Sequence, residues 1–182
     1  MLDKRIIEQV LSEQYQELSS QGKMEFCSRY EEELVDLDSN MAQVVIGVRR
    51  SGKSVLCYNV LKKHEKEFAY VNFDDERFEH LQSGDLNTLL EVLYKIYGDF
   101  KYLFLDEIQN VDGWHLFVNR LLRQRMHVLV TGSNAKLLSG ELATHLTGRY
   151  EQIELYPFSF SEYCLCKGMD VRSNTTKAEA FR

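Results

Sequence analysis

The stretch "GVRRSGKS", from Gly47 to Ser54, constrains the fold of this chain more than any other segment. It follows the apolar run "AQVVI" and leads into "VLCYNVLKKHEKEF". A glycine-rich turn between a buried strand and a helix lets successive backbone N–H groups point at one anion, and the helix N-terminus adds partial positive charge. The sequence therefore predicts a phosphate-binding loop inside an α/β fold.

The residues of this loop have separate expected tasks. Gly47 should permit the tight turn, and Gly52 should permit a close approach of the backbone to phosphate. Lys53 can reach the β- and γ-phosphates, and the Ser54 hydroxyl can ligate Mg²⁺. We expect nucleotide contacts from the whole loop and the next residue, namely Gly47, Val48, Arg49, Arg50, Ser51, Gly52, Lys53, Ser54 and Val55. An ordinary strand–helix turn with the same letters is the alternative.

The two arginines inside the loop have two possible positions. Arg49 and Arg50 either touch phosphate or point outward into water, as charged loop residues usually do.

The remaining chain alternates between strand-like and helix-like patterns. Apolar runs predict buried strands at 42–48, 69–74, 101–107, 127–133 and 149–155. Helical patterns cover 2–19, 24–37, 53–67, 85–98, 113–125 and 134–146. Strands that alternate with helices indicate a mostly parallel sheet covered on both faces. The predicted fold is thus an α/β three-layer sandwich around five strands, preceded by N-terminal helices.

We expect three regions along the chain. Residues 1–38 form an N-terminal helical segment, and residues 39–165 form the nucleotide-binding core. Residues 166–182 begin a linker or a truncated region, because no terminal element is completed there. On this reading the chain is a fragment, and a following domain is missing.

Composition excludes several classes of protein. The net charge of −6 gives no bulk attraction to nucleic acid or anionic lipid. The start of the chain has no apolar core of a signal peptide, and no apolar run approaches the roughly 20 residues that span a bilayer. Four cysteines show no zinc-ligand spacing, so we expect reduced thiols and a cytoplasmic protein.

The run "YLFLDEIQ" predicts an acidic site. Asp106 and Glu107 follow an apolar strand, at the sheet edge where open parallel sheets bind ligands. Asp106 can hold Mg²⁺ together with Ser54, and Glu107 can orient or deprotonate an attacking water. A helix cap or a solvated turn is the alternative for an isolated acidic pair. The GTP-specific strings N/T-K-x-D and D-x-x-G do not occur, which favours ATP.

Three further polar residues are candidates at strand ends. Ser133 and Asn134 follow the run "HVLVTG" and either sense the γ-phosphate or cap the next helix. Arg149 precedes the last strand, where a guanidinium either stabilises transition-state charge or lies on the surface.

Several segments together resemble a known family. They are "GVRRSGKS", "VNFDDERF", "LFLDEIQNVDGW", "VTGSNAKLLSGELATHLTGRY" and "ELYPFSF". In this order they resemble the prokaryotic AAA+ ATPases that carry an N-terminal ATPase module and a C-terminal domain of unknown function. The resemblance covers roughly residues 40–163.

This resemblance implies particular roles and a particular topology. It implies a Walker A loop at 47–54, a Walker B pair at Asp106 and Glu107, and a sensor at Ser133 or Asn134. Arg149 would act as a finger, in cis or toward a neighbouring subunit. The strand at 128–132 would lie between the Walker A and Walker B strands.

The function that follows is Mg²⁺-dependent ATP hydrolysis that drives or gates a conformational change. The partners would be the missing C-terminal domain, a second copy of the chain or another protein. A nucleotide-gated switch with little turnover and a P-loop small-molecule kinase stay open as alternatives.

Overall fold

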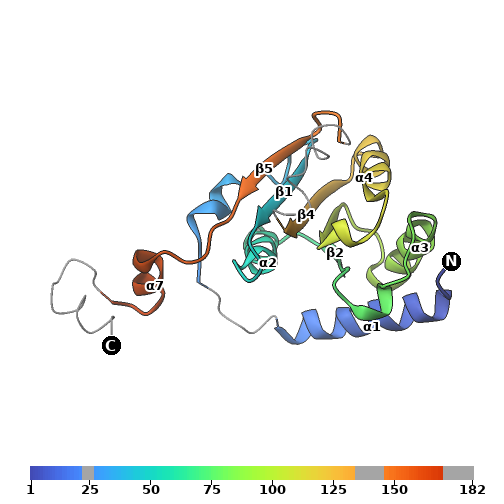
Figure 1. The fold of residues 1–182 in the computed structure, drawn as a ribbon, viewed down its shortest axis with the longest axis horizontal. Coiled ribbons are helices and arrows are strands. Elements are labelled where there is room, and N and C mark those ends of the chain that lie inside the picture. The colour runs from blue at the N-terminus through green and yellow to red at the C-terminus, as the bar shows by residue number, and fades with distance from the viewer. Residues whose placement is uncertain (22–26, 134–145, 170–182) are drawn as a thin grey trace.

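The computed structural model describes residues 1–21, 27–133 and 146–169. At its centre is one five-stranded sheet, shown in Figure 1. Its strands are β1 (Ala42–Gly47), β2 (Phe68–Asn72), β3 (Tyr102–Asp106), β4 (His127–Ser133) and β5 (Tyr150–Glu154). The strand order is β2-β3-β4-β1-β5, and every neighbouring pair is parallel. The predicted sheet is confirmed, with β4 between β1 and β3.

The central strands bury side chains on both faces, which explains their continuous apolar sequences. Along β1, Val44 and Ile46 enter one hydrophobic cluster, whereas Val45 between them enters a second one. The same alternation places Phe104 of β3 opposite its neighbours Leu103 and Leu105.

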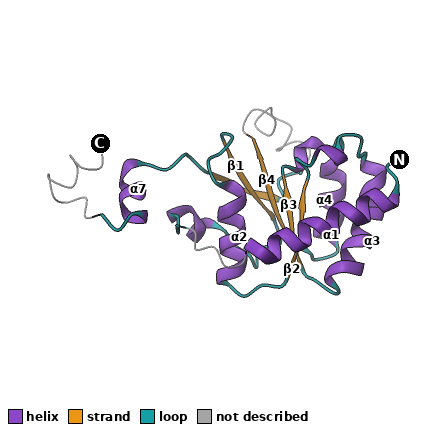
Figure 2. Cartoon of the chain, turned by 90° about the horizontal axis from the view of Figure 1, so that it is seen from below, coloured by secondary structure: helices purple, strands orange, loops and turns teal. Residues whose placement is uncertain are grey.

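Helices cover both faces of this sheet and complete three layers (Figure 2). The first face packs against α1 (Lys4–Gln21), α3 (Leu86–Tyr97) and α4 (Trp114–Arg123). The second face packs against α2 (Lys53–Lys63) and the extended residues Val35 and Leu37. The core therefore consists of two clusters separated by the sheet.

The two edges of the sheet are finished differently. At one edge, the Gln14 side chain of α1 donates to Asn72 O and accepts from Asn72 N, each at 3.0 Å, so it pairs with the backbone of β2. At the other edge, β5 carries Glu151 and Glu154, and Glu151 accepts a hydrogen bond from Gln43. The described helices include none that is long and apolar enough to cross a membrane.

The helix predicted at 24–37 is wrong over its described part. Only a 3-10 turn, η1 (Tyr30–Leu34), forms there, and residues 22–26 lie outside the described residues. Val35 and Leu37 are buried while their neighbours Asp36 and Asp38 are exposed. This period of two belongs to an extended chain and overrides the helical pattern.

Two other segments differ from the sequence-based view. The helix predicted at 134–146 lies almost wholly outside the described residues. At the other end, α7 (Phe160–Cys166) was not predicted, and its N-terminus is capped by Ser159, whose hydroxyl accepts from Glu162 N. Figure 1 shows α7 standing apart from the helices that cover the sheet.

A disulfide joins Cys27 to Cys166, across 139 residues of sequence. The expectation of four reduced thiols is therefore wrong for this pair, while Cys57 and Cys164 are free and buried. No spacing motif links Cys27 to Cys166, so only the fold brings them together. The bond fixes α7 to the segment that precedes η1.

Thiol counting tests this bond. The unfolded chain, purified without reductant, should label at two of its four cysteines, and at all four after treatment with a dithiol. Reduction should lower the free energy of unfolding by on the order of 2–4 kcal/mol, because a long closed loop restricts the unfolded chain. A Cys27→Ser, Cys166→Ser double variant should not respond to the dithiol. Four labelled thiols before reduction would exclude the bond.

Arg77 ties α1 to the loop after β2. Its guanidinium contacts Glu13 Oε2 at 2.5 Å and Asp75 Oδ2 at 2.8 Å. Hydrogen bonds from Arg77 lower the pKa of both carboxyls. A carboxyl whose pKa is lowered in the folded state stabilises the protein at pH values above its ordinary pKa. This stabilisation is lost as the pH falls through the lowered pKa.

Arg77→Met should therefore destabilise the chain more at pH 7 than at pH 3. Urea unfolding at both pH values measures the difference, with Arg5→Met, on the exposed side of α1, as the control. An equal loss at the two pH values would contradict an electrostatic role.

Candidate nucleotide-binding site

The loop between β1 and α2 depends on two glycines in different ways. A Cβ at Gly47 would lie 2.2 Å from Leu155 O and 2.8 Å from Ser51 Oγ, so only glycine fits between these atoms. Gly52 has a φ of 94°, which glycine adopts without strain. Gly47 is thus required by close packing and Gly52 by its positive φ, while the close approach of Gly52 to phosphate stays a prediction.

Lys53 is buried at the first position of α2, with 4% of its side chain exposed. Its ammonium lies 3.4 Å from Gly47 O and 3.3 Å from Val48 O, and 3.4 Å from Glu107 Oε1. A buried cation is costly unless negative partners compensate it. In this structure two carbonyl oxygens and one carboxylate provide that compensation.

The other loop residues divide into buried and exposed ones. Ser51 is 2% exposed, and its Oγ has no hydrogen-bond partner among the described residues. Val48, Arg49 and Arg50 are exposed, and Arg49 forms an ion pair with Asp74 at 3.5 Å. Both arginines of the loop are therefore exposed, and the backbone, Ser51 and Lys53 form its inner surface.

Asp106 ends β3 beside this loop and receives three hydroxyl donors. Ser54 Oγ donates to Oδ1 at 2.8 Å, Tyr70 OH donates to Oδ2 at 3.2 Å, and Thr131 Oγ1 also donates to Oδ1. Strands β2, β3 and β4 thus place their ends together, because carboxyl ends of parallel strands share one edge. The predicted neighbours Ser54 and Asp106 are in direct contact.

Burial dominates the electrostatics of this carboxyl. Asp106 is 4% exposed, and desolvation raises its pKa although the hydroxyls of Thr131 and Ser54 oppose the shift. The pKa of Tyr70 is also raised, first by burial and then by the negative charge of Asp106. A cation at this edge would therefore stabilise the ionised carboxylate.

Glu107 follows in a constrained backbone conformation. Its φ of 55° and ψ of 38° lie in the left-handed region, which is uncommon for a residue other than glycine. Its N–H donates to Thr131 Oγ1 at 3.0 Å, and Gln109 Nε2 donates to its Oε2 at 2.6 Å. The carboxylate consequently faces Lys53 rather than solvent.

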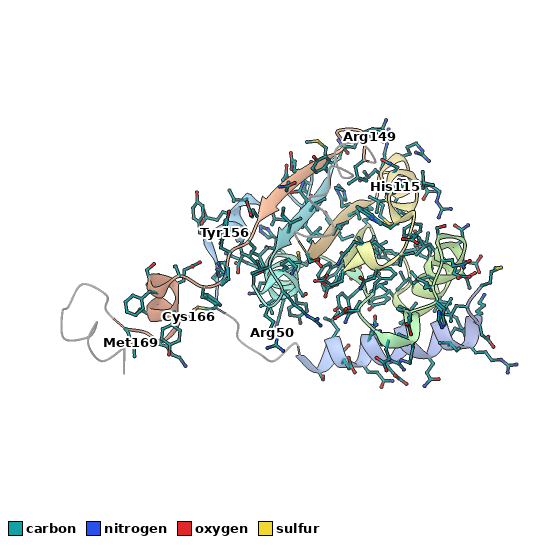
Figure 3. The ribbon with its side chains drawn as sticks, in the orientation of Figure 1. Arg50, His115, Arg149, Tyr156, Cys166 and Met169 are labelled. Atoms are coloured by element: carbon teal, nitrogen blue, oxygen red, sulfur yellow. A yellow bond between two sulfur atoms is a disulfide. The ribbon has the colours of Figure 1, made fainter. Side chains whose placement is uncertain are left out.

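The remaining predicted residues are placed differently. Ser133 ends β4 and pairs in register with Gly47, next to the loop, whereas Asn134 lies outside the described residues. Arg149 is exposed before β5, at the opposite end of the strands, and its O accepts from Ala42 N. Figure 3 shows Arg149 and Arg50 far apart. Within one chain Arg149 does not join the site.

Arg29, which the sequence did not single out, connects the loop to α7. It is 6% exposed, and its guanidinium donates to Ser51 O at 3.4 Å, Tyr156 O at 3.0 Å and Glu162 Oε1 at 2.7 Å. It also lies 4.4 Å from the ring centroid of Phe158. The partners that link it to α7 are more than a hundred residues away in the sequence, so no local pattern marks this role.

A mainly apolar pocket of about 310 Å³ lies between the start of α2 and α7. It shares residues with both the disulfide and the loop between β1 and α2, so it lies directly beside that loop. Its lining residues are Cys27, Arg29, Gly52, Val55, Leu56, Asn59, Phe158, Tyr163 and Cys166. A second pocket, of about 410 Å³, lies between α1 and β2 and contains none of the predicted site residues.

The donor set at the sheet edge fits Mg²⁺ better than a transition metal. Ser54 and Asp106 offer hard oxygen atoms, and the described residues contain no group of three or more His, Cys, Asp or Glu side chains that could form a protein-only metal site. Mg²⁺ commonly takes one or two protein oxygens and completes its shell with water and phosphate.

Comparison with known proteins places this geometry in a family. Residues 39–164 match the AAA domain family. An uncharacterized protein of Methanocaldococcus jannaschii is 40% identical over 152 residues, which is 81% of this chain and 34% of that protein. An uncharacterized protein of Haemophilus influenzae is 38% identical over 144 residues, which is 75% of this chain and 36% of that protein. The chain thus spans about a third of the length of these relatives.

Among solved structures, the S. cerevisiae Hsp104:casein complex in its extended conformation has a TM-score of 0.55 at 15% identity, over 90% of this chain and 31% of that chain. At this identity the likeness concerns the fold alone. The family match and the shared fold agree with the phosphate loop and the acidic strand end described above. This chain belongs to the AAA domain family, and residues 39–164 form a nucleotide-binding module of the ATPase type.

Proposed function

We propose that this module binds Mg²⁺–ATP at the loop between β1 and α2 and hydrolyses it. One observation carries the proposal: at the carboxyl edge of a parallel sheet, the Lys53 ammonium lies 3.4 Å from Glu107 Oε1, and the neighbouring Ser54 hydroxyl donates to Asp106 Oδ1 at 2.8 Å. Phosphoryl transfer requires such groups at one place: a positively charged ammonium, a hydroxyl and two carboxylates.

The phosphates would be held by the loop and Lys53. The first N–H groups of α2 have no partner within the helix, and they lie beside the buried, unpartnered Ser51 hydroxyl. In the present structure the Lys53 ammonium contacts two carbonyl oxygens and one carboxylate. A triphosphate offers it more negative charge, so nucleotide binding should draw the ammonium away from Glu107.

The acidic pair would act on the metal and on water. Ser54 and Asp106 would hold Mg²⁺, which supplies charge neutralisation at the β- and γ-phosphates when bound. Glu107 would take a proton from the attacking water while the oxygen of that water forms a bond to the γ-phosphorus. The bond to the bridging oxygen then breaks, and ADP and inorganic phosphate leave.

The nucleobase would enter the apolar pocket beside Gly52. The pocket continues from the start of α2 and offers the aromatic rings of Phe158 and Tyr163, with Asn59 as a polar group. A flat aromatic base suits such a lining, since stacking and apolar contact need little geometric change in the protein.

The conformational output would pass through Arg29. Because its guanidinium bonds to Ser51 of the loop and to Glu162 of α7, a change at the phosphates can alter how α7 is held. The task of the whole protein, a motor or a nucleotide-gated switch, then depends on what α7 contacts: further residues of the same protein, a second copy or another protein. A small-molecule kinase would transfer phosphate to a second substrate and would therefore need a second substrate pocket next to Glu107.

Lys53→Ala tests nucleotide binding. The variant should lose tenfold to a hundredfold in Mg²⁺–ATP affinity, since a hydrogen bond to a charged group contributes about 1.5–3 kcal/mol. Calorimetric titration measures the affinity, and Lys101→Ala, which removes an exposed lysine at the other end of the sheet, is the matched control. Parent-like affinity in Lys53→Ala would place the phosphate site elsewhere.

Glu107→Gln tests hydrolysis separately from binding. The amide keeps the shape of the side chain but cannot take a proton, so phosphate release should fall by about 10²–10⁴ while ATP affinity stays within a few-fold of the parent. Phosphate release is followed in a single turnover with excess protein. Glu79→Gln, which changes the same charge at an exposed position, should keep the parental rate. An unchanged rate in Glu107→Gln would assign the base to another group.

A further inference from the structure

We infer that Gln109 is a positioning residue for hydrolysis: it holds one carboxylate oxygen of Glu107, so that the other oxygen is the one that receives the proton of the attacking water. The inference rests on the proposed function. It adds a residue and an atom-level assignment to that site.

The geometry separates the two oxygens of the Glu107 carboxylate. Gln109 Nε2 donates to Oε2 at 2.6 Å, whereas Oε1 lies 3.4 Å from the Lys53 ammonium. The Glu107 backbone is fixed in its left-handed conformation by the hydrogen bond to Thr131 Oγ1. Only the side-chain torsions of Glu107 remain to be set, and these two contacts set them.

The two contacts should respond differently when a triphosphate binds. The Lys53 ammonium has a stronger partner in phosphate and would release Oε1. The Gln109 amide carries no charge, so a bound phosphate does not attract it as strongly as it attracts the Lys53 ammonium. The hydrogen bond from Gln109 to Oε2 of Glu107 should therefore remain. Oε1 then becomes free to accept a proton, while the Gln109 bond keeps the carboxylate in place. General base catalysis requires this kind of fixed geometry.

The backbone around Gln109 makes this placement rigid. Gln109 lies in the short 3-10 turn η4 (Ile108–Asn110). Before it, Ile108 is completely buried, and after it, Asn110 Nδ2 donates to Phe73 O at 3.2 Å. Both flanks are therefore anchored, which limits where the amide can lie.

A second observation separates this role from ordinary packing. Gln109 Oε1 is buried and has no hydrogen-bond partner among the described residues. Turning the amide over would place that oxygen against the Glu107 carboxylate, so the contact with Glu107 fixes the orientation. A buried acceptor without a donor costs stability, and an apolar side chain of the same length would avoid the cost. Gln109 thus orients Glu107, although its unpaired oxygen lowers the stability of the fold.

The experiment compares stability, binding and turnover in Gln109→Met, which keeps the length of the side chain and removes both polar groups. Thermal unfolding should give a Tm equal to or above that of the parent, and Mg²⁺–ATP affinity should stay within about twofold, because Gln109 touches no phosphate-binding group. Single-turnover phosphate release should fall at least about tenfold, since Glu107 loses its orientation. Gln109→Glu, which presents a second carboxylate to Oε2, should lose at least as much.

A double-mutant cycle shows whether Gln109 acts through Glu107. In a Glu107→Gln background, Gln109→Met should cause no further loss of rate, because no base is left to orient. Gln124→Met, at an exposed position after α4, is the matched control and should keep the parental rate.

The outcomes distinguish this inference from the proposed function. If the parent chain releases phosphate and the Gln109→Met variant releases it at the same rate, the role of Gln109 is overturned, while the proposed hydrolysis stands. Losses that multiply in the double variant, or a lowered Tm that accounts for the lost rate, overturn it as well. A parent chain that binds ATP but releases no phosphate overturns the proposed hydrolysis, and the positioning role with it.

Discussion

A carboxylate that has lost nearly all contact with water organises the centre of this molecule. Asp106 ends a strand that is buried on both faces, and three hydroxyl groups from α2, β2 and β4 replace its solvent. Those donors only partly offset the cost of burial, because the pKa of Asp106 remains raised. The order of β2, β3 and β4 and the start of α2 beside them bring these donors to one carboxylate.

The neighbouring Lys53–Glu107 contact follows from the same crowding. The two oppositely charged side chains lie where little water reaches, so each compensates the charge of the other. Asp106 accepts three hydrogen bonds from hydroxyl groups, whereas the Glu107 carboxylate contacts Lys53 and Gln109. The strand end therefore gives two residues that are adjacent in sequence quite different surroundings.

The apolar runs were sufficient to predict a parallel five-stranded sheet, whereas its strand order followed from the family resemblance. Ser54 and Asp106 were predicted to share one metal ion, which agrees with their proximity, but the Lys53–Glu107 contact was not predicted. Arg29, Tyr70 and the Cys27–Cys166 bond were missed, because each joins segments that only the folded chain brings together. Thr131 and Gln109 stood inside quoted motifs, but their tasks depend on which way a hydroxyl or an amide points, and a string of letters does not carry that information.

The unequal edges of the sheet have a consequence for aggregation. A strand with an open edge is a template on which other chains add strands and start fibres. On the β2 side, Gln14 already occupies backbone groups of the edge strand. On the β5 side, a second copy laid along the strand would bring Glu151 and Glu154 close to further carboxylates, and like charges oppose that pairing. The chain can thus leave the carboxyl ends of its strands accessible without offering the sides of the sheet to uncontrolled growth.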